Sequence, residues 1–219
     1  INWVYQAEPS GKMDYLLLYP LTRLENELPG LTPQQPIAVD YRSDVFEGST
    51  SQVLVLTYQP PGCLRVLDPE VEVENTAPQE VIRKALPLTG WKWILPVGSG
   101  QVPQDTFGAP PAETWCEFYE KADLARQLGD WAGAVQAWQG AQAAGLWPQD
   151  AVEYMPFIEA YAHSEDWGQS VALSREAAKP GSQYPEMVCR LWARIERETP
   201  AGAERDGALG TVRAELNCE

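Results

Sequence analysis

Apolar positions in the first half of the chain follow the two-residue period of strands. Residues 37–46 alternate apolar and polar over their later half, which is typical of a half-buried strand. Residues 52–58 are β-branched and nearly continuously apolar, which favours a strand buried on both faces. After the Pro60-Pro61-Gly62 turn, residues 63–67 return antiparallel. These segments predict an antiparallel meander, with further strands at 3–6, 15–19 and 91–95 and a helix at 76–86.

From residue 113 the apolar period becomes helical. Phe118, Ala122, Ala125 and Leu128 form one stripe, and Gly129 suits the left-handed position at a helix end. Later apolar stripes predict a helix from residue 131, a helix at 154–161 that kinks or starts late at Pro156, and a helix at 167–178. They also predict a helix at 185–198, with Arg190, Arg194 and Arg197 outward, and a short polar helix at 203–216.

A Gly- and Pro-rich stretch, residues 97–111, separates the two patterns and predicts a linker or extended strap. The predicted fold class is therefore α+β. Residues 1–112 form a mainly antiparallel β domain, and residues 113–219 form an all-α domain.

Two Asp-Trp pairs in the helical half lie 36 positions apart (167 − 131), and Ala141 recurs as Ala177. A fixed period of this length indicates stacked helical units that share one core. We expect Trp131 and Trp167 to occupy equivalent buried places in it. On that basis Trp131→Ala should cost about 3–5 kcal/mol.

These positions resemble the tetratricopeptide repeat over residues 115–178. Ala122, Gly129-Asp130-Trp131, Ala134, Trp138 and Ala141 fill the places of its pattern in the first unit. The second unit departs from it, with Glu165 for Gly, Ser170 for Ala and Ser174 for the aromatic residue. The resemblance implies two repeats plus capping helices, with two residues more than the usual spacing of about 34.

A second resemblance covers more of the chain and rests on residues 60–69 (PPGCLRVLDP) and 118–131 (FYEKADLARQLGDW). The chain is similar to the soluble C-terminal region of uncharacterised multi-pass bacterial membrane proteins, some with a glycosyltransferase-like membrane part. The resemblance implies an extracytoplasmic piece of a larger membrane protein, and the start at Ile1 without Met fits an excised piece. It supplies no catalytic residue.

The composition and the net charge indicate a globular chain and limit the classes of partner it could bind. The chain is 44% hydrophobic and 21% charged, as globular proteins are, and its net charge of −15 argues against nucleic acid. The sequence has neither an apolar run long enough to span a bilayer nor a visible signal peptide.

The sequence offers no enzyme signature. His163 is the only histidine and has no Gly-x-Ser-x-Gly elbow to serve, so we interpret it as a surface or groove residue. The cysteines lack metal-ligand spacing, and Gly98-Ser99-Gly100 lacks the third glycine of a dinucleotide loop. We therefore predict no catalytic residue, metal or cofactor.

Asp40 and Asp44, on one face of a predicted strand, form a pair of the kind glycosidases use, although chance produces such pairs among 31 acidic residues.

Four cysteines allow three full pairings. A bridge between Cys63 and Cys116 would join the two halves, and reduced, buried cysteines are the alternative that the sequence leaves open.

The remaining candidate is a groove lined by the first helix of each repeat. Mixed charge with a Tyr and a Met suits a peptide or partner loop, whereas a solvated or covered helix face is the alternative. The outward positions would be Tyr119, Asp123, Arg126, Gln127, Met155, Glu159 and His163.

The sequence thus predicts a non-enzymatic protein-interaction or assembly domain that works beside a parent membrane domain. The alternative is an accessory domain of a membrane glycosyltransferase that holds a glycan, in which Trp91, Trp93 and Trp147 would stack on sugar rings. A third reading, a stand-alone hydrolase, would need a cleft at Asp40 and Asp44.

Overall fold

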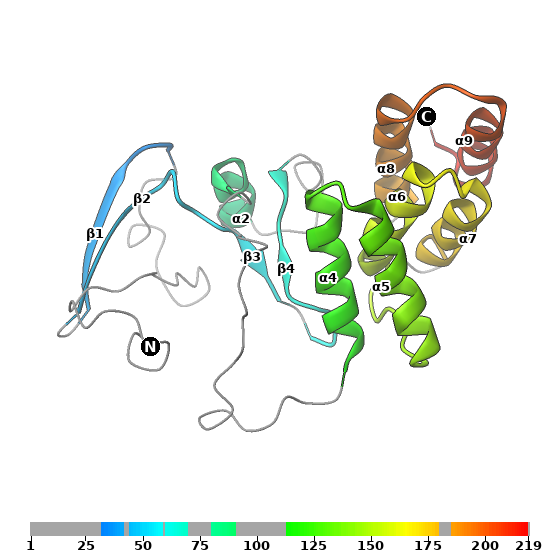
Figure 1. Cartoon of the computed structure of the whole chain (residues 1–219). Helices are drawn as coiled ribbons and strands as arrows, with labels where there is room; N and C mark the ends of the chain where they lie inside the picture. Colours follow the sequence, from blue (N-terminus) through cyan, green and yellow to red (C-terminus); the bar gives the residue numbers. More distant parts are fainter. Residues whose placement is uncertain are drawn as a thin grey trace. The chain divides into compact units, whose positions relative to one another are not determined.

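The computed structural model describes residues 32–41, 44–58, 60–69, 80–90, 113–179 and 185–218 (Figure 1). The chain divides into two compact units: a sheet unit of residues 1–56 and 66–111, and a helical unit of residues 57–65 and 112–219. Antiparallel sheets in the N-terminal half and helices in the C-terminal half give an α+β fold. The predicted strands at 3–6, 15–19 and 91–95 and the strap at 97–111 lie outside the described residues.

A β-hairpin forms the first sheet. Strands β1 (Pro36–Tyr41) and β2 (Asp44–Ser49) pair antiparallel, with Tyr41 opposite Asp44. The single strand predicted at 37–46 is therefore wrong, because the chain reverses between Tyr41 and Asp44. Asp40 and Asp44 consequently lie on different strands and do not share a face of one strand.

Buried Thr50 closes the open end of this hairpin. Its hydroxyl accepts a hydrogen bond from the backbone N–H of Gln35 at 2.8 Å and donates one to the carbonyl oxygen of Thr32 at 2.5 Å.

A second two-stranded sheet pairs β3 (Leu56–Thr57) with β4 (Arg65–Val66). The two sheets are separate, so the predicted three-strand meander is wrong. Burial of residues 52–58 on both faces is also wrong, because Val55 is buried whereas Leu54 and Leu56 are exposed. The strand has only two residues, neither of which is buried, and Val55 just before it is the residue that enters the core.

A small core lies beside this second sheet. Val55, Leu67 and Leu86 are its buried members, and helix α2 (Glu80–Ala85) with the 3-10 helix η2 (Leu86–Leu88) supplies one side of it. The helix predicted at 76–86 is confirmed over its described residues.

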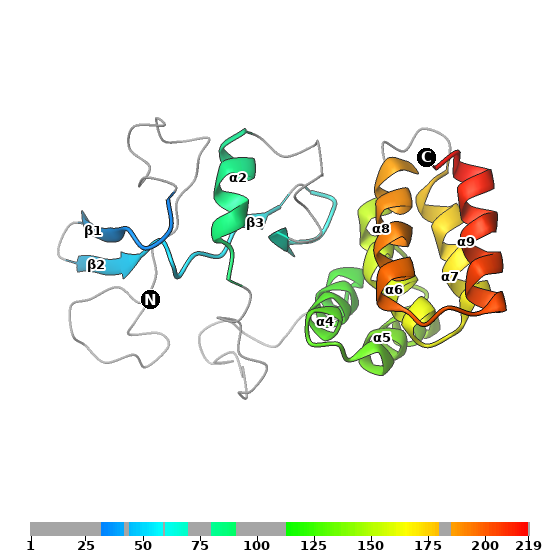
Figure 2. The same cartoon turned by 90° about the horizontal axis from the view of Figure 1, so that it is seen from above.

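The helical unit is built from antiparallel pairs. In Figures 1 and 2 the first helix of each pair lies on one side and the second on the other. The pairs are α4 (Trp115–Gln127) with α5 (Trp131–Ala143), α6 (Met155–His163) with α7 (Trp167–Ala177), and α8 (Pro185–Glu198) with α9 (Ala203–Leu216). The helices predicted at 185–198 and 203–216 are confirmed. Pro156 lies in the first turn of α6, after the 3-10 helix η4 (Ala151–Tyr154), so the predicted late start is also confirmed.

The turn inside the first pair recurs in the second. The side chains of Asp130 and Asp166 cap α5 and α7 by accepting hydrogen bonds from the backbone N–H groups three residues on, at 2.9 and 3.0 Å. The residues before them, Gly129 and Glu165, both have a left-handed backbone, with φ of +70° and +62°. Glu165 therefore keeps the turn although it replaces glycine. Helix α9 begins at 203, again 36 residues after α7 (203 − 167).

The buried side chains of α5 and α7 also correspond at this spacing. Ala141 and Ala177 are buried, as are Trp138 and Ser174. The small Ser174 leaves room beside it for the buried indole of Trp192, whose Nε1–H donates to the Ser174 hydroxyl at 2.8 Å. A buried indole therefore occupies the equivalent position in both pairs. In the first pair it is Trp138 of α5 itself, and beside Ser174 of the second pair it is Trp192 of α8.

Trp131 does not have the buried place expected of it. It is only half-buried and stacks on the imidazole of His163 with ring centroids 3.9 Å apart, whereas the half-buried Trp167 lies beside Trp192. Leu128 was likewise expected in the α4 stripe but is exposed, because it follows the last residue of the helix. The buried face of α4 is Trp115, Tyr119, Ala122 and Ala125.

Helix α9 is fastened to the pair before it and to α8. Arg175 of α7 donates two hydrogen bonds to Glu215 of α9, at 2.7 and 2.6 Å, and these hold the pKa of Glu215 below its usual value. A disulfide joins Cys189 of α8 to Cys218, just beyond α9. Among the described residues, no helix combines the length and the apolar character that crossing a membrane requires.

Trp138→Ala should lower the free energy of unfolding by about 3–5 kcal/mol, because it empties a fully buried site. Trp131→Ala should cost less, about 1–2 kcal/mol, because part of that indole is already in water and the main loss is its stacking. Urea denaturation of both variants tests the comparison. Equal losses would contradict this assignment of the two indoles.

Gly129→Ala should destabilise the chain by about 1 kcal/mol, because a Cβ is unfavourable at positive φ. No atom lies within 4 Å of the added Cβ, so the cost is one of backbone conformation alone. Glu165→Gly should raise stability by up to about 1 kcal/mol for the same reason. Thermal denaturation measures both changes, and a destabilising Glu165→Gly would show that the second turn is not strained.

Candidate functional site

The predicted groove positions lie on α4 and α6, but most of them do not face solvent. Tyr119, Met155 and Glu159 are buried, so the prediction that they point outward is wrong. Tyr119 lies one turn after Trp115 on the buried face of α4. Helix α6 packs against α4, α5, α7 and α8, and every residue from 155 to 162 is buried.

The other predicted positions on α4 bond to one another. Arg126 Nε donates to Asp123 Oδ1 at 2.9 Å, and Gln127 Nε2 donates to Asp123 Oδ2 at 3.2 Å. The side chains of Arg126 and Asp123 are only 9% and 14% exposed. This part of the predicted groove is therefore an internally paired polar cluster, with little surface left to present.

A second charged cluster joins α6 to α8. The carboxylate of Glu159 accepts two hydrogen bonds from Arg194, from Nε at 3.0 Å and from a terminal nitrogen at 2.7 Å. Arg194 was expected to point outward but is only 12% exposed. The correction has a direct cause, since a carboxylate as buried as Glu159 needs a counter-charge beside it.

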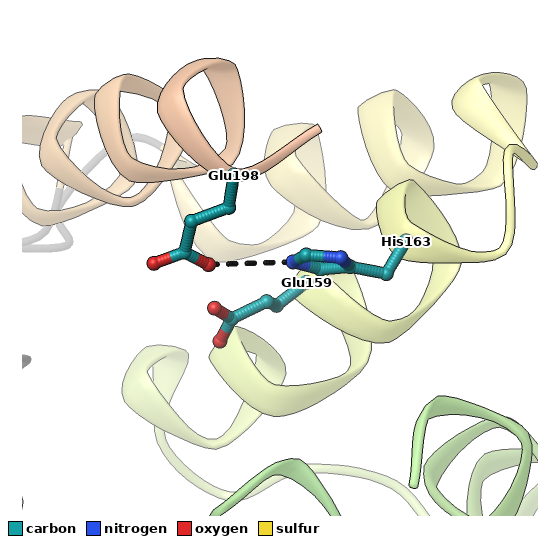
Figure 3. Close-up of side chains that lie close together, drawn as sticks. All are labelled: Glu159, His163 and Glu198. Atoms are coloured by element: carbon teal, nitrogen blue, oxygen red, sulfur yellow. Dashed lines mark ion pairs between the residues drawn. The ribbon is translucent and has the colours of Figure 1, made fainter. Parts of the chain in front are cut away.

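His163 belongs to the same cluster. Its ring is stacked on Trp131, and its Nε2 lies 3.4 Å from Oε2 of Glu198, without the geometry of a hydrogen bond. Figure 3 shows Glu159, His163 and Glu198 converging from α6 and α8. The structure thus brings two of the predicted positions, Glu159 and His163, together with Glu198, which the sequence reasoning missed. A signal existed: Glu159 and His163, like Arg194 and Glu198, are four residues apart on one helix and so share a face.

The opposite end of the helical unit is organised by Glu153, a fully buried carboxylate. It accepts hydrogen bonds from the backbone N–H groups of Cys63 and Gln149, each at 2.8 Å, and of Asp150 at 3.2 Å. It also accepts one from the indole of Trp115 at 2.7 Å. One side chain therefore joins segment 57–65, the start of α4 and the loop before η4. Sequence reasoning missed it. A signal existed, because Asp150 and Glu153 have the spacing of a capping box, which the structure forms at the start of η4.

A disulfide supports the same junction. Of the alternatives that the sequence left open, the structure has the bridge between Cys63 and Cys116. The bridge joins the two halves of the sequence as expected, but segment 57–65 of the first half belongs to the helical unit, so the bridge fastens that segment to α4.

Large apolar side chains are exposed around this junction. Leu64 follows Cys63 and is 43% exposed, whereas Trp147 precedes Gln149 by two residues and is 53% exposed. Tyr58, at the start of the same segment, is 63% exposed. We call these three residues the Trp147 surface. The bonds to Glu153 and the disulfide fix the backbone next to Leu64, at Cys63, and close to Trp147, at Gln149.

Trp147 is itself supported from below. Its indole stands edge-on to that of Trp138, with ring centroids 6.2 Å apart, and Trp138 in turn contacts Trp115 and Phe157 in the core. The exposed ring is therefore the outermost member of a packed aromatic series. Trp91 and Trp93, the other aromatics predicted to meet a glycan, lie outside the described residues.

No protein-family model, curated protein or solved structure matches this chain.

Glu153→Gln should lower the free energy of unfolding by about 1–3 kcal/mol, because an amide NH₂ would face N–H donors that need an acceptor. Amide hydrogen exchange should also accelerate at Cys63 and Gln149, the two backbone donors at 2.8 Å. Glu113→Gln, at an exposed position just before α4, is the control and should change neither quantity. A stable Glu153→Gln variant with unchanged exchange would contradict this role.

Proposed function

We propose that this chain is a non-enzymatic protein-interaction domain whose contact region is the Trp147 surface. The observation behind the proposal is an exposed Trp, Tyr and Leu held on a rigid base. Trp and Tyr dominate the binding energy of interfaces. A base already fixed by Glu153 and by a disulfide reduces the entropy lost on binding.

The helical unit suits such a role. Its turn, its capping aspartates and its buried small residues recur at 36 positions, which supports the tetratricopeptide-like reading of residues 115–178. Proteins built of such repeats bind partners through extended surfaces. The charges on α4 and α6 are engaged within the unit, so the partner would meet the end that bears Trp147 and not the groove predicted from sequence.

The context of the chain belongs to the same proposal. Two disulfides pair all four cysteines, and such bridges persist in oxidising compartments. This supports an extracytoplasmic domain of a larger membrane protein, whose membrane part would be one partner.

A peptide library displayed on phage and selected against the whole chain tests the proposal. We expect selected peptides whose affinity falls about tenfold or more in Trp147→Ala, as when a central interface residue is truncated. Leu128→Ala is the matched control, because Leu128 is similarly exposed at the other end of α4. Failure to select any peptide, or equal binding to Trp147→Ala and wild type, would overturn the proposal.

The exposed indole of Trp147 also favours a second candidate, binding of a glycan by stacking on a sugar ring. The same protein titrated with oligosaccharides separates the two. A change in tryptophan fluorescence that is lost in Trp147→Phe, without any selected peptide, would favour the glycan.

A further inference from the structure

Three potential metal ligands converge at the end of the helical unit opposite the Trp147 surface. Glu159 and His163 come from α6 and Glu198 from α8, and one ligand atom from each lies within 4.8 Å of the other two (Figure 3). We propose that these three residues bind a divalent transition-metal ion of the Zn²⁺ type. The site is independent of the proposed partner surface.

The distance between His163 and Glu198 fits two ligands of one ion. Nε2 and Oε2 are 3.4 Å apart, longer than an ordinary N–H···O hydrogen bond. Two ligands on a tetrahedral Zn²⁺ with bonds of about 2.0–2.1 Å lie about 3.3–3.4 Å from each other. The two atoms therefore stand where a shared ion would hold them.

The imidazole is prepared for this role by its surroundings. Nε2 is shielded from solvent and has no hydrogen-bond partner, and the side chain as a whole is 13% exposed. Stacking on Trp131 fixes the plane of the ring. A buried nitrogen without a hydrogen bond is costly, and a metal ion would satisfy it.

Arg194 is the group that competes with an ion. It donates two hydrogen bonds to Glu159, and its Nε is 4.0 Å from Oε1 of Glu198. A carboxylate has about four lone-pair sites, so the two bonds from Arg194 leave Glu159 able to bind a metal. Such an outer partner also orients a ligating carboxylate.

The charges favour a cation as well. Two carboxylates and one guanidinium leave a net charge of −1 when His163 is neutral, which is the form that binds metal. A mixed set of imidazole and carboxylate ligands from two helices suits Zn²⁺ and similar ions. The ion would fasten α6 to α8 at their C-terminal ends.

Zn²⁺ titrated into the whole chain and followed by calorimetry tests the site, with Co²⁺ absorption as a report of tetrahedral geometry. We expect saturable binding of one ion per chain and a melting temperature that rises with Zn²⁺. Glu198→Gln, at a side chain that is 43% exposed, should weaken binding about tenfold or more without unfolding the protein.

Glu196→Gln is the matched control, because Glu196 lies on the same helix with similar exposure but pairs with Arg213. It should bind Zn²⁺ as the wild type does. His163→Gln should lose the ion, and circular dichroism without metal shows whether this variant remains folded. No saturable binding up to about 1 mM Zn²⁺, or binding that survives Glu198→Gln unchanged, would overturn the site and leave an ion-pair network around Arg194.

Discussion

The helical unit depends on one buried negative charge. Glu153 lies inside the protein, and its oxygens accept hydrogen bonds from four N–H groups, of which those of Cys63 and Trp115 would otherwise be buried without a partner. An ionised carboxylate is expensive to bury unless several donors surround it. The most distant donor, Cys63, is 90 residues from Glu153 in the sequence, so the charge is stable only where these parts of the chain meet. This requirement defines one arrangement of segment 57–65, α4 and η4.

The unit is further restrained at both ends of its chain. The bridge from Cys63 to Cys116 fastens segment 57–65 to the first helix, and the bridge from Cys189 to Cys218 fastens the residues after the last helix to α8. Stacked helical pairs need such closure, because a terminal pair would otherwise leave an apolar face in water. The exposed residues of α9 are charged or small, and its buried residues are Ala208, Leu209 and Val212.

Buried charge explains why the two ends of the pairs differ. At one end the carboxylate of Glu153 is satisfied mainly by backbone N–H groups, so large apolar side chains can stand on the surface above it. At the other end Glu159 is satisfied by Arg194, which brings Glu198 and His163 close to it. The proposed partner surface and the proposed metal site therefore lie at opposite ends of one bundle.

The sequence by itself determined the helices, their order and their turns. The apolar period of 3.6 residues and the left-handed position at Gly129 are local properties, so the sequence pattern was enough to predict them. Capping by Asp130 and Asp166 is equally local, but it was not predicted. The strands were predicted less well, since a strand of two residues such as β3 depends on its partner and not on its own pattern. Only the tertiary structure decided which side chains face solvent. Trp131, Tyr119 and Glu159 have the spacing expected of their helices, but α6 is enclosed by four others, and that enclosure decides which residues are buried. The candidate sites at Trp147 and at Glu159, His163 and Glu198 join residues distant in sequence, and the chain brings them together only when the whole unit has folded.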